Sequence, residues 1–151
     1  MREWRVRVEI PLRPTEDEEK VRGLLERIVV PDRIYVEETG EFKTIVAEAR
    51  CVTSLSRLHS LLRRERILDA TRKRLLRSLG ENRLTILIHK QALAAGRLSL
   101  VDDDRESPLG AVRVEVTHPN PREVVDWLVP ATSRGRPLWE KETVTGDCPG
   151  E

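Results

Sequence analysis

The sequence predicts a single α+β domain, in which a mostly antiparallel sheet of about five or six strands carries about three or four helices packed on one face. Short segments alternate apolar and polar residues with the period of two that is typical of half-buried strands. Between them lie segments whose apolar residues recur at helical spacing. The chain has 151 residues, of which 38% are hydrophobic, so it can bury a core without metals or disulfides.

The first predicted strand covers residues 4–10, in which every second residue is apolar. Pro11 ends this strand. Thr15 and Glu18 have the spacing of a capping box and predict that a helix starts there. This helix ends before Pro31, and its apolar stripe consists of Val21, Leu24, Leu25 and Ile28.

The next segment is predicted to be a hairpin followed by a long, interrupted helical region. Residues 34–36 and 42–49 form the two strands, joined by a linker that contains a glycine. Ser54 is the expected cap of the helix that follows. The helical region carries two apolar stripes that are out of phase by roughly a quarter turn. We therefore expect a kink or break near residues 63–66.

The second half of the chain adds further strands and helices. Residues 84–88 and 112–116 alternate as strands do, and residues 98–101 are a brief strand candidate. Residues 90–95 predict a short helical turn. The last helix, within residues 120–130, opens with asparagine, proline and a glutamate at its third position.

The charge on the whole chain is only +1, so any preference for nucleic acid must come from how the charges are distributed. Residues 54–78 contain eight Lys or Arg and two Asp or Glu, a local charge of +6. On a helical projection, Arg66, Lys73 and Arg77 lie opposite an apolar stripe and form a cationic row suited to phosphates. The alternative is a solvated helix face with ion pairs such as Asp69 to Lys73.

Two other cations have distinct predicted roles. Lys90 lies at a strand-to-helix junction, where it could hold a phosphate or simply begin the helix. Arg72 projects near the apolar stripe, so we expect it to form a structural ion pair with a carboxylate.

The sequence shows no catalytic or metal-binding pattern. The three histidines, His59, His89 and His118, lack metal-ligand spacing, so we expect no metal site. The acidic loop at residues 102–106 lacks the spacing and glycine of an EF-hand, and a solvated loop is favoured. No nucleophile motif is apparent, so we expect neither catalysis nor a cofactor. A small-molecule enzyme with no visible motif is the distant alternative.

We divide the chain into one domain, residues 1–130, and a C-terminal tail, residues 131–151, that lacks periodicity. The tail is expected to be disordered or ordered by contact, with Trp139 as its anchor. Cys51 and Cys148 are far apart in the sequence, so we expect no disulfide framework and no redox motif. High charge and a single methionine are typical of thermophilic proteins.

The location is predicted to be cytoplasmic. No apolar run approaches the roughly 18 residues of a spanning helix, so we expect no membrane contact. The first strand pattern begins at once, without an export signal before it.

Several stretches together resemble the archaeal uncharacterised protein family 0201 over about residues 2–132. They are Pro14-Thr15-Glu16-Asp17-Glu18-Glu19-Lys20-Val21, Arg66-Ile67-Leu68-Asp69-Ala70 with Arg72-Lys73, His89-Lys90-Gln91-Ala92, and Ser107-Pro108-Leu109-Gly110 with Asp126-Trp127-Leu128-Val129-Pro130. The resemblance implies an archaeal source, RNA binding, and a fold like that of the large-subunit ribosomal protein that contacts the smallest ribosomal RNA. His89 stands where that family usually has asparagine.

The resemblance also implies a candidate protein partner. Some members of the family are fused to, or encoded beside, a P-loop nucleotide-kinase-like protein of the dephospho-CoA kinase type. This chain has no P-loop motif, so such a kinase would be a separate molecule.

We therefore predict an RNA-binding protein whose phosphate contacts are Arg63, Arg64, Arg66, Lys73 and Arg77, with Lys90 assisting. Only five aromatic residues are present, and none of them lies in a pair of alternating strands that would form a platform for base stacking. Contact with the shape of structured RNA is therefore favoured. The alternative function is an interaction or regulatory module for the kinase-like partner, using the acidic segment 16–19 or the sheet edge.

Overall fold

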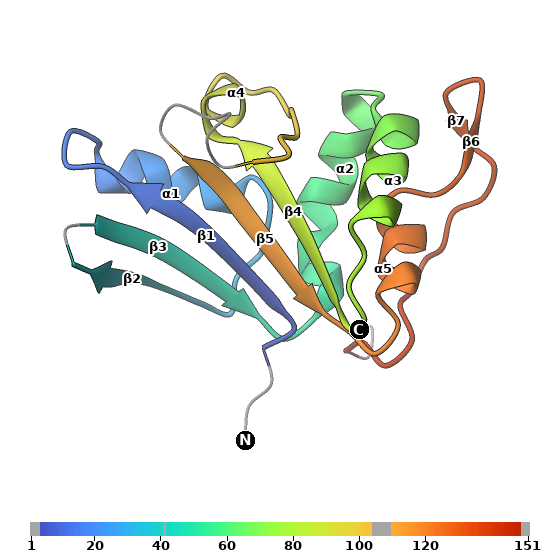
Figure 1. The fold of residues 1–151 in the computed structure, drawn as a ribbon, viewed down its shortest axis with the longest axis horizontal. Helices are drawn as coiled ribbons and strands as arrows, with labels where there is room; N and C mark the ends of the chain where they lie inside the picture. Colours follow the sequence, from blue (N-terminus) through green and yellow to red (C-terminus); the bar gives the residue numbers. More distant parts are fainter. Residues whose placement is uncertain (1–3, 41, 104–109, 149–151) are drawn as a thin grey trace.

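The computed structural model describes residues 4–40, 42–103 and 110–148. Its centre is a five-stranded sheet in the order β2-β3-β1-β5-β4, and all four strand pairings are antiparallel (Figure 1). The strands are β1 (Val6–Leu12), β2 (Arg33–Thr39), β3 (Phe42–Ala49), β4 (Arg83–His89) and β5 (Ala111–Thr117). This arrangement confirms the predicted α+β fold class and its mostly antiparallel sheet.

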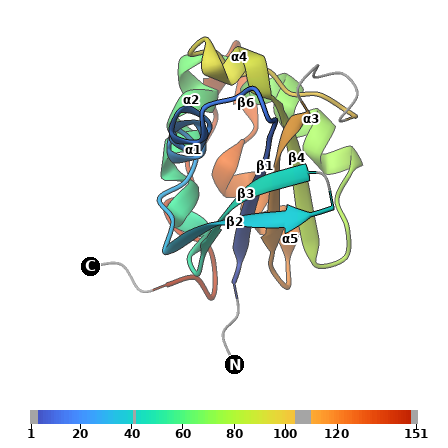
Figure 2. The ribbon, with the colours of Figure 1, turned by 90° about the vertical axis from the view of Figure 1, so that its left-hand side faces the viewer.

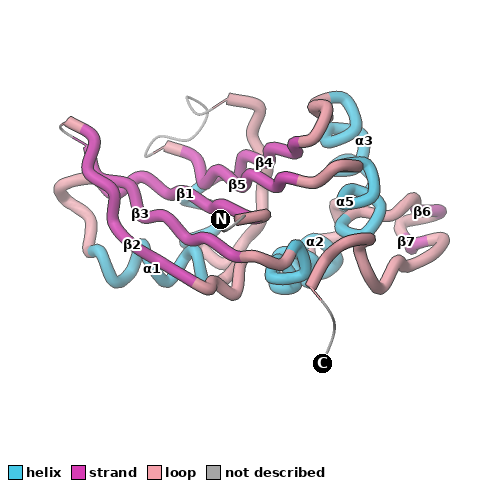
Figure 3. The backbone as a smooth tube through the Cα atoms, turned by 90° about the horizontal axis from the view of Figure 1, so that it is seen from below, coloured by secondary structure: helices cyan, strands magenta, loops and turns pink. Residues whose placement is uncertain are grey.

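Helices cover one face of the sheet and leave the other face open (Figures 2 and 3). They are α1 (Glu18–Glu26), the short 3-10 helix η1 (Val52–Leu55), α2 (Ser56–Arg64), α3 (Leu68–Arg77), α4 (Lys90–Ala94) and α5 (Pro121–Leu128). Helix α1 contacts β1 and β3, whereas α3, α4 and α5 contact β4.

The core lies between the sheet and these helices. Alternate residues of β1, including Val8 and Ile10, are fully buried against apolar helical residues such as Leu25 and Leu58. Burial of this apolar surface is the main free-energy gain of the fold. In β1 the intervening residues Arg7 and Glu9 point to the open face, as the period of two predicts.

Two helix starts differ from the sequence prediction. Helix α1 begins at Glu18 and is capped by Asp17, whose Oδ1 accepts a hydrogen bond from the Glu19 amide at 2.9 Å. Thr15 is therefore not the cap, because Glu16 bends back to accept from the Arg13 amide and ends the preceding turn. Ser54 lies inside η1, and α2 begins at Ser56 without a side-chain cap.

The expected break near residues 63–66 is confirmed. Helix α2 ends at Arg64, α3 begins at Leu68, and Arg66 between them has a φ of 58°. The turn rotates α3 so that both apolar stripes reach the core, which resolves their phase difference. The strand candidate at 98–101 is reduced to one isolated bridge between Leu100 and Ile88. The predicted loop and turn across residues 102–110 lie largely outside the described residues.

Residues 131–148 lie along the domain surface and include the short strands β6 (Thr132–Ser133) and β7 (Arg136–Pro137). Val144 is buried, whereas Trp139 remains 41% exposed, so Trp139 is not the main anchor. Asp147 accepts hydrogen bonds from the amides of Val52 at 2.6 Å and Thr53 at 3.1 Å.

A disulfide joins Cys51 to Cys148 across 97 residues of sequence. The prediction of no disulfide was therefore wrong. Sequence separation carries no information on the distance between the end of β3 and the tail, which only the folded chain brings together. No helix among the described residues is long and apolar enough to cross a membrane.

Candidate nucleic-acid interface

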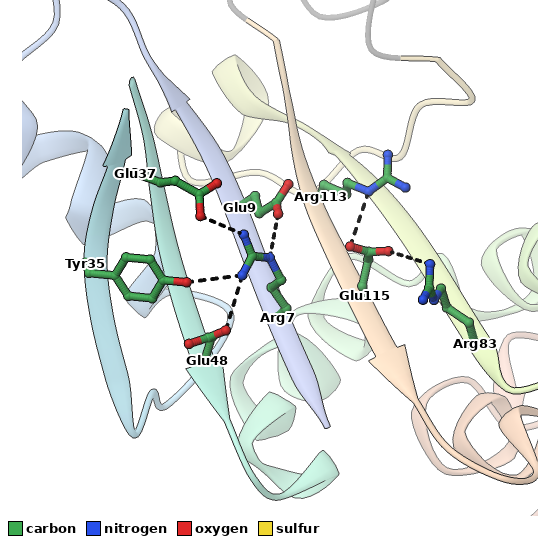
Figure 4. Close-up of polar contacts among 8 residues, drawn as sticks. All are labelled: Arg7, Glu9, Tyr35, Glu37, Glu48, Arg83, Arg113 and Glu115. Carbon is green, nitrogen blue, oxygen red and sulfur yellow. Dashed lines mark hydrogen bonds and ion pairs between the residues drawn. The ribbon is translucent and has the colours of Figure 1, made fainter. Parts of the chain in front are cut away.

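The open face of the sheet is covered by charged side chains that largely neutralise one another (Figure 4). Arg7 donates from Nε to Glu9 at 2.6 Å and from Nη1 to the Tyr35 hydroxyl at 3.1 Å. It also bonds Glu48 at 3.2 Å and Glu37 at 3.4 Å. Burial alone would lower the pKa of Arg7, but the hydrogen bonds that Arg7 donates to Glu9 and Tyr35 outweigh this effect and raise the pKa.

The same pattern continues across the rest of this face. Glu115 on β5 lies between Arg83 at 3.5 Å and Arg113 at 3.7 Å, and Arg33 pairs with the buried Glu48 at 3.6 Å. A phosphate approaching these arginines would have to compete with a carboxylate for each one. The open sheet face is therefore a poor principal site for polyanions.

The α2–α3 segment presents cations that are much less neutralised. Arg66 is exposed in the turn, and Lys73 and Arg77 lie one helical turn apart on α3. The Lys73 side chain is 74% exposed and pairs only loosely with Asp69, at 3.3 Å. Among the described residues, Arg66 and Arg77 have no carboxylate within ion-pair distance. Arg66 precedes α3 and has a positive φ, so the helical projection that put it in line with Lys73 and Arg77 does not apply to it. We call these three exposed cations, of which Lys73 and Arg77 belong to the helix, the α3 row.

Arg63 and Arg64 project to different sides of α2 and do not join this row. Arg63 is 21% exposed and forms a two-bond pair with Glu140 in the tail, at 2.7 and 3.0 Å. Its Nη1 also donates to the Leu128 carbonyl at 3.0 Å. The Arg63 bonds hold the pKa of Glu140 below its ordinary value. Arg64 donates instead to the Gly96 carbonyl at 3.1 Å.

Lys90 is buried, with its side chain 2% exposed. Its Nζ donates to the Pro11 carbonyl at 2.6 Å and to Glu16 at 2.8 Å. Burial lowers the pKa of Lys90 and outweighs the opposing effect of Glu16. The ammonium ties α4 to the end of β1 and cannot reach an RNA phosphate, which corrects the prediction that it assists binding.

His89 has a structural role at the start of α4. Its Nδ1 accepts a hydrogen bond from the Ala92 amide at 3.1 Å and so caps α4. An asparagine oxygen can do the same at this position.

Arg72 forms the structural ion pair that its position predicts. It lies 2.8 Å from Asp126 on α5 and donates to the Val129 carbonyl at 3.0 Å. In the acidic segment 16–19, Glu16 and Asp17 are occupied by the contacts described above. Glu18 pairs with Arg22 at 3.4 Å, so this segment offers less exposed charge to a partner than its sequence suggests.

One potential metal-ligand group occurs among the described residues, formed by Cys51, Asp147 and Cys148 within 4.8 Å. Both sulfurs are in the disulfide, and the Asp147 carboxylate already accepts hydrogen bonds from η1.

Sequence reasoning missed one group of basic residues. Arg27, Arg57 and Arg64 line a common cavity between α1, α2 and the end of α4. Arg27 lies outside the basic stretch 54–78, so composition could not associate it with the others. The spacing of seven between Arg57 and Arg64 places them on one helix face and was the signal available.

Comparisons with known proteins match most of the chain. A family model described as RNA binding matches residues 5–118. The UPF0201 protein of Aeropyrum pernix is 50% identical over 138 residues, covering 91% of this chain and 92% of that protein. The UPF0201 protein of Sulfolobus acidocaldarius is 46% identical over 136 residues, covering 90% and 94%.

A solved structure shows the same fold. The crystal structure of the UPF0201 protein from Methanococcus jannaschii matches with a TM-score of 0.73 and 24% sequence identity. The match covers 88% of this chain and 98% of the other.

Proposed function

We propose that this chain, which belongs to the family of archaeal UPF0201 proteins, binds structured RNA through the α3 row. The match of residues 5–118 to a family model described as RNA binding supports this proposal. The observation that carries this proposal is the contrast between two cationic surfaces. On the open sheet face, the strand arginines Arg7, Arg33, Arg83 and Arg113 are paired with carboxylates. In contrast, Arg66 and Arg77 have no carboxylate within ion-pair distance among the described residues.

The physical basis is counterion release. A cation that neutralises a phosphate releases a condensed counterion, and this gain is largest for exposed cations that are not already paired. Lys73 keeps only an exposed i,i+4 contact with Asp69, and such pairs contribute little to stability. A phosphate can therefore replace Asp69 as the partner of Lys73 at small cost.

The distribution of aromatic residues favours recognition of RNA shape over base stacking. On the open sheet face, where strand alternation also places Phe42, the Tyr35 hydroxyl accepts a hydrogen bond from Arg7. The more exposed Phe42 and Trp139 lie on β3 and in the tail, away from α3. Backbone contacts of this kind predict weak sequence preference.

The test compares wild type with Arg66→Glu/Lys73→Glu/Arg77→Glu for binding to a duplex RNA across a salt series. Each phosphate contact should contribute about 0.7 to 0.9 to the slope of the logarithm of the binding constant against the logarithm of the salt concentration. The variant loses three contacts, so its slope should be smaller by about two to three. Circular dichroism checks that the variant is folded.

A matched control separates local from overall charge. Lys20→Glu/Arg122→Glu/Arg136→Glu changes the net charge by the same amount at exposed residues of α1, α5 and β7. The control should retain most of the wild-type slope. Equal losses in the two variants would show that binding follows net charge alone and would refute the proposed surface.

A further inference from the structure

A cavity of about 610 Å³ lies where α1, α2 and the end of α4 meet, and none of its lining residues belongs to α3. Figures 1 and 2 show these three helices on the helical side of the sheet. Its charged lining residues are Arg27, Arg57 and Arg64. We call this site the arginine groove.

One face of α2 supplies most of the groove. Arg57, Ser60, Leu61 and Arg64 follow the spacing i, i+3, i+4, i+7, which places them in a single line along the helix. Arg27, the residue directly after the last residue of α1, lines the groove from the other side. Three guanidinium groups from two helices therefore face one volume.

Each arginine is held in place by a backbone carbonyl at a helix end. Arg57 donates to the carbonyl of Glu26, the last residue of α1, at 2.5 Å. Arg27 donates to the Leu93 carbonyl at 2.5 Å, and Arg64 to the Gly96 carbonyl at 3.1 Å, both at the end of α4. Cations are stabilised at helix C-termini, and each guanidinium keeps further N–H donors for a ligand.

Among the described residues, no carboxylate forms an ion pair with these three arginines, although the charge of Glu65 attracts Arg64. The part of the groove lining that the structure describes contains no carboxylate. Glu65, next to Arg64 in sequence, instead accepts hydrogen bonds from Arg97 at 2.8 Å and from the Leu98 amide at 3.1 Å. The Arg97 bond lowers the pKa of Glu65, so it stays ionised and engaged there.

We propose that the arginine groove binds a phosphomonoester, carried either by the 5′ end of an RNA strand or by a free nucleoside monophosphate. A phosphomonoester carries about −1.5 to −2 charges at neutral pH and offers three acceptor oxygens, which suits three guanidinium groups. Ser60 adds a hydroxyl donor. Leu61 and Leu93 supply an apolar wall for the sugar or base, and the volume is that of a typical small-ligand site.

The site is independent of the proposed RNA surface, because it shares no residue with the α3 row. The two proposals can therefore fail separately. Loss of duplex binding in the α3 variant concerns only the row, whereas the experiments below concern only the groove.

The first experiment measures binding of AMP, inorganic phosphate and adenosine to the full chain by calorimetry. AMP should bind at least about tenfold more tightly than adenosine, since the phosphate supplies the charge-assisted bonds. The variant Arg27→Gln/Arg57→Gln/Arg64→Gln should lose this preference. The matched control Arg66→Gln/Lys73→Gln/Arg77→Gln removes the same charge elsewhere and should keep it.

The second experiment compares single-stranded RNA with a 5′ phosphate and with a 5′ hydroxyl. If the protein prefers the 5′-phosphorylated RNA and does not bind AMP, the site is assigned to RNA ends. If it binds AMP as tightly as the 5′-phosphorylated RNA, the site is assigned to free nucleotides. The single variant Arg27→Gln gives the same comparison if the triple variant is unfolded. Absence of any preference for the phosphate, or a preference unchanged by these variants, overturns the proposal.

Discussion

Removing the Cys51–Cys148 disulfide should lower the free energy of unfolding by up to about 4–5 kcal/mol. The bond closes a loop with a sequence separation of 97 residues, and the chain-entropy cost of such a loop in the unfolded state gives this magnitude. The change is Cys51→Ser/Cys148→Ser. Guanidinium unfolding followed by tryptophan fluorescence measures the loss.

Reduction of the wild type provides the matching control. A phosphine reductant should destabilise wild type to the level of the double variant and leave the variant unchanged. Equal stability of oxidised wild type and double variant, within about 0.5 kcal/mol, would refute the loop-closure reasoning. Free thiols in the untreated protein would refute the disulfide itself.

Two further predictions concern ion pairs. Lys90→Met should destabilise the protein by about 1–3 kcal/mol in chemical unfolding, because the Pro11 carbonyl and the part-buried Glu16 lose the ammonium that bonds both of them. Duplex RNA affinity should stay unchanged. Glu140→Gln should destabilise the protein at neutral pH, because Arg63 lowers the pKa of Glu140 in the folded state. That contribution is fully present above the ordinary pKa of glutamate and is lost as pH falls through the folded-state value.

Each prediction has an outcome that contradicts it. Lys90→Met with wild-type stability but weakened RNA binding would return Lys90 to the phosphate-binding surface. For Glu140→Gln, the stability difference from wild type should shrink between pH 7 and pH 3. A difference that is constant over this range would show that the Arg63–Glu140 pair does not depend on ionisation.

Local sequence patterns predicted the elements of this fold well and their ends less well. Alternation and helical spacing depend on which face of an element is buried, so they identified β1 and the apolar stripe of α1. The break between α2 and α3 followed from the same spacing. The cap of α1 was misplaced because Glu16 bonds the Arg13 amide, and several acidic residues in a row can each serve as a cap.

The candidate site was predictable only in part. The helix face on which a basic residue lies depends on local spacing, whereas the pairing of its charge depends on distant parts of the chain. Helical spacing decides which residues share a face, and it correctly grouped Lys73 with Arg77. Whether a cation is left unpaired depends on what the rest of the chain brings within reach. Arg63 pairs with Glu140, 77 residues away, and Lys90 pairs with Glu16, 74 residues away.

The sequence by itself therefore determined the fold class, the order of most elements and the concentration of positive charge on α2 and α3. These properties arise from periodicity and composition, which are local. Tertiary structure alone decided which cations remain exposed, that Arg27 joins Arg57 and Arg64, and that Cys51 meets Cys148. Electrostatic and covalent pairing act over a few ångströms, and only folding brings such distant residues to that distance.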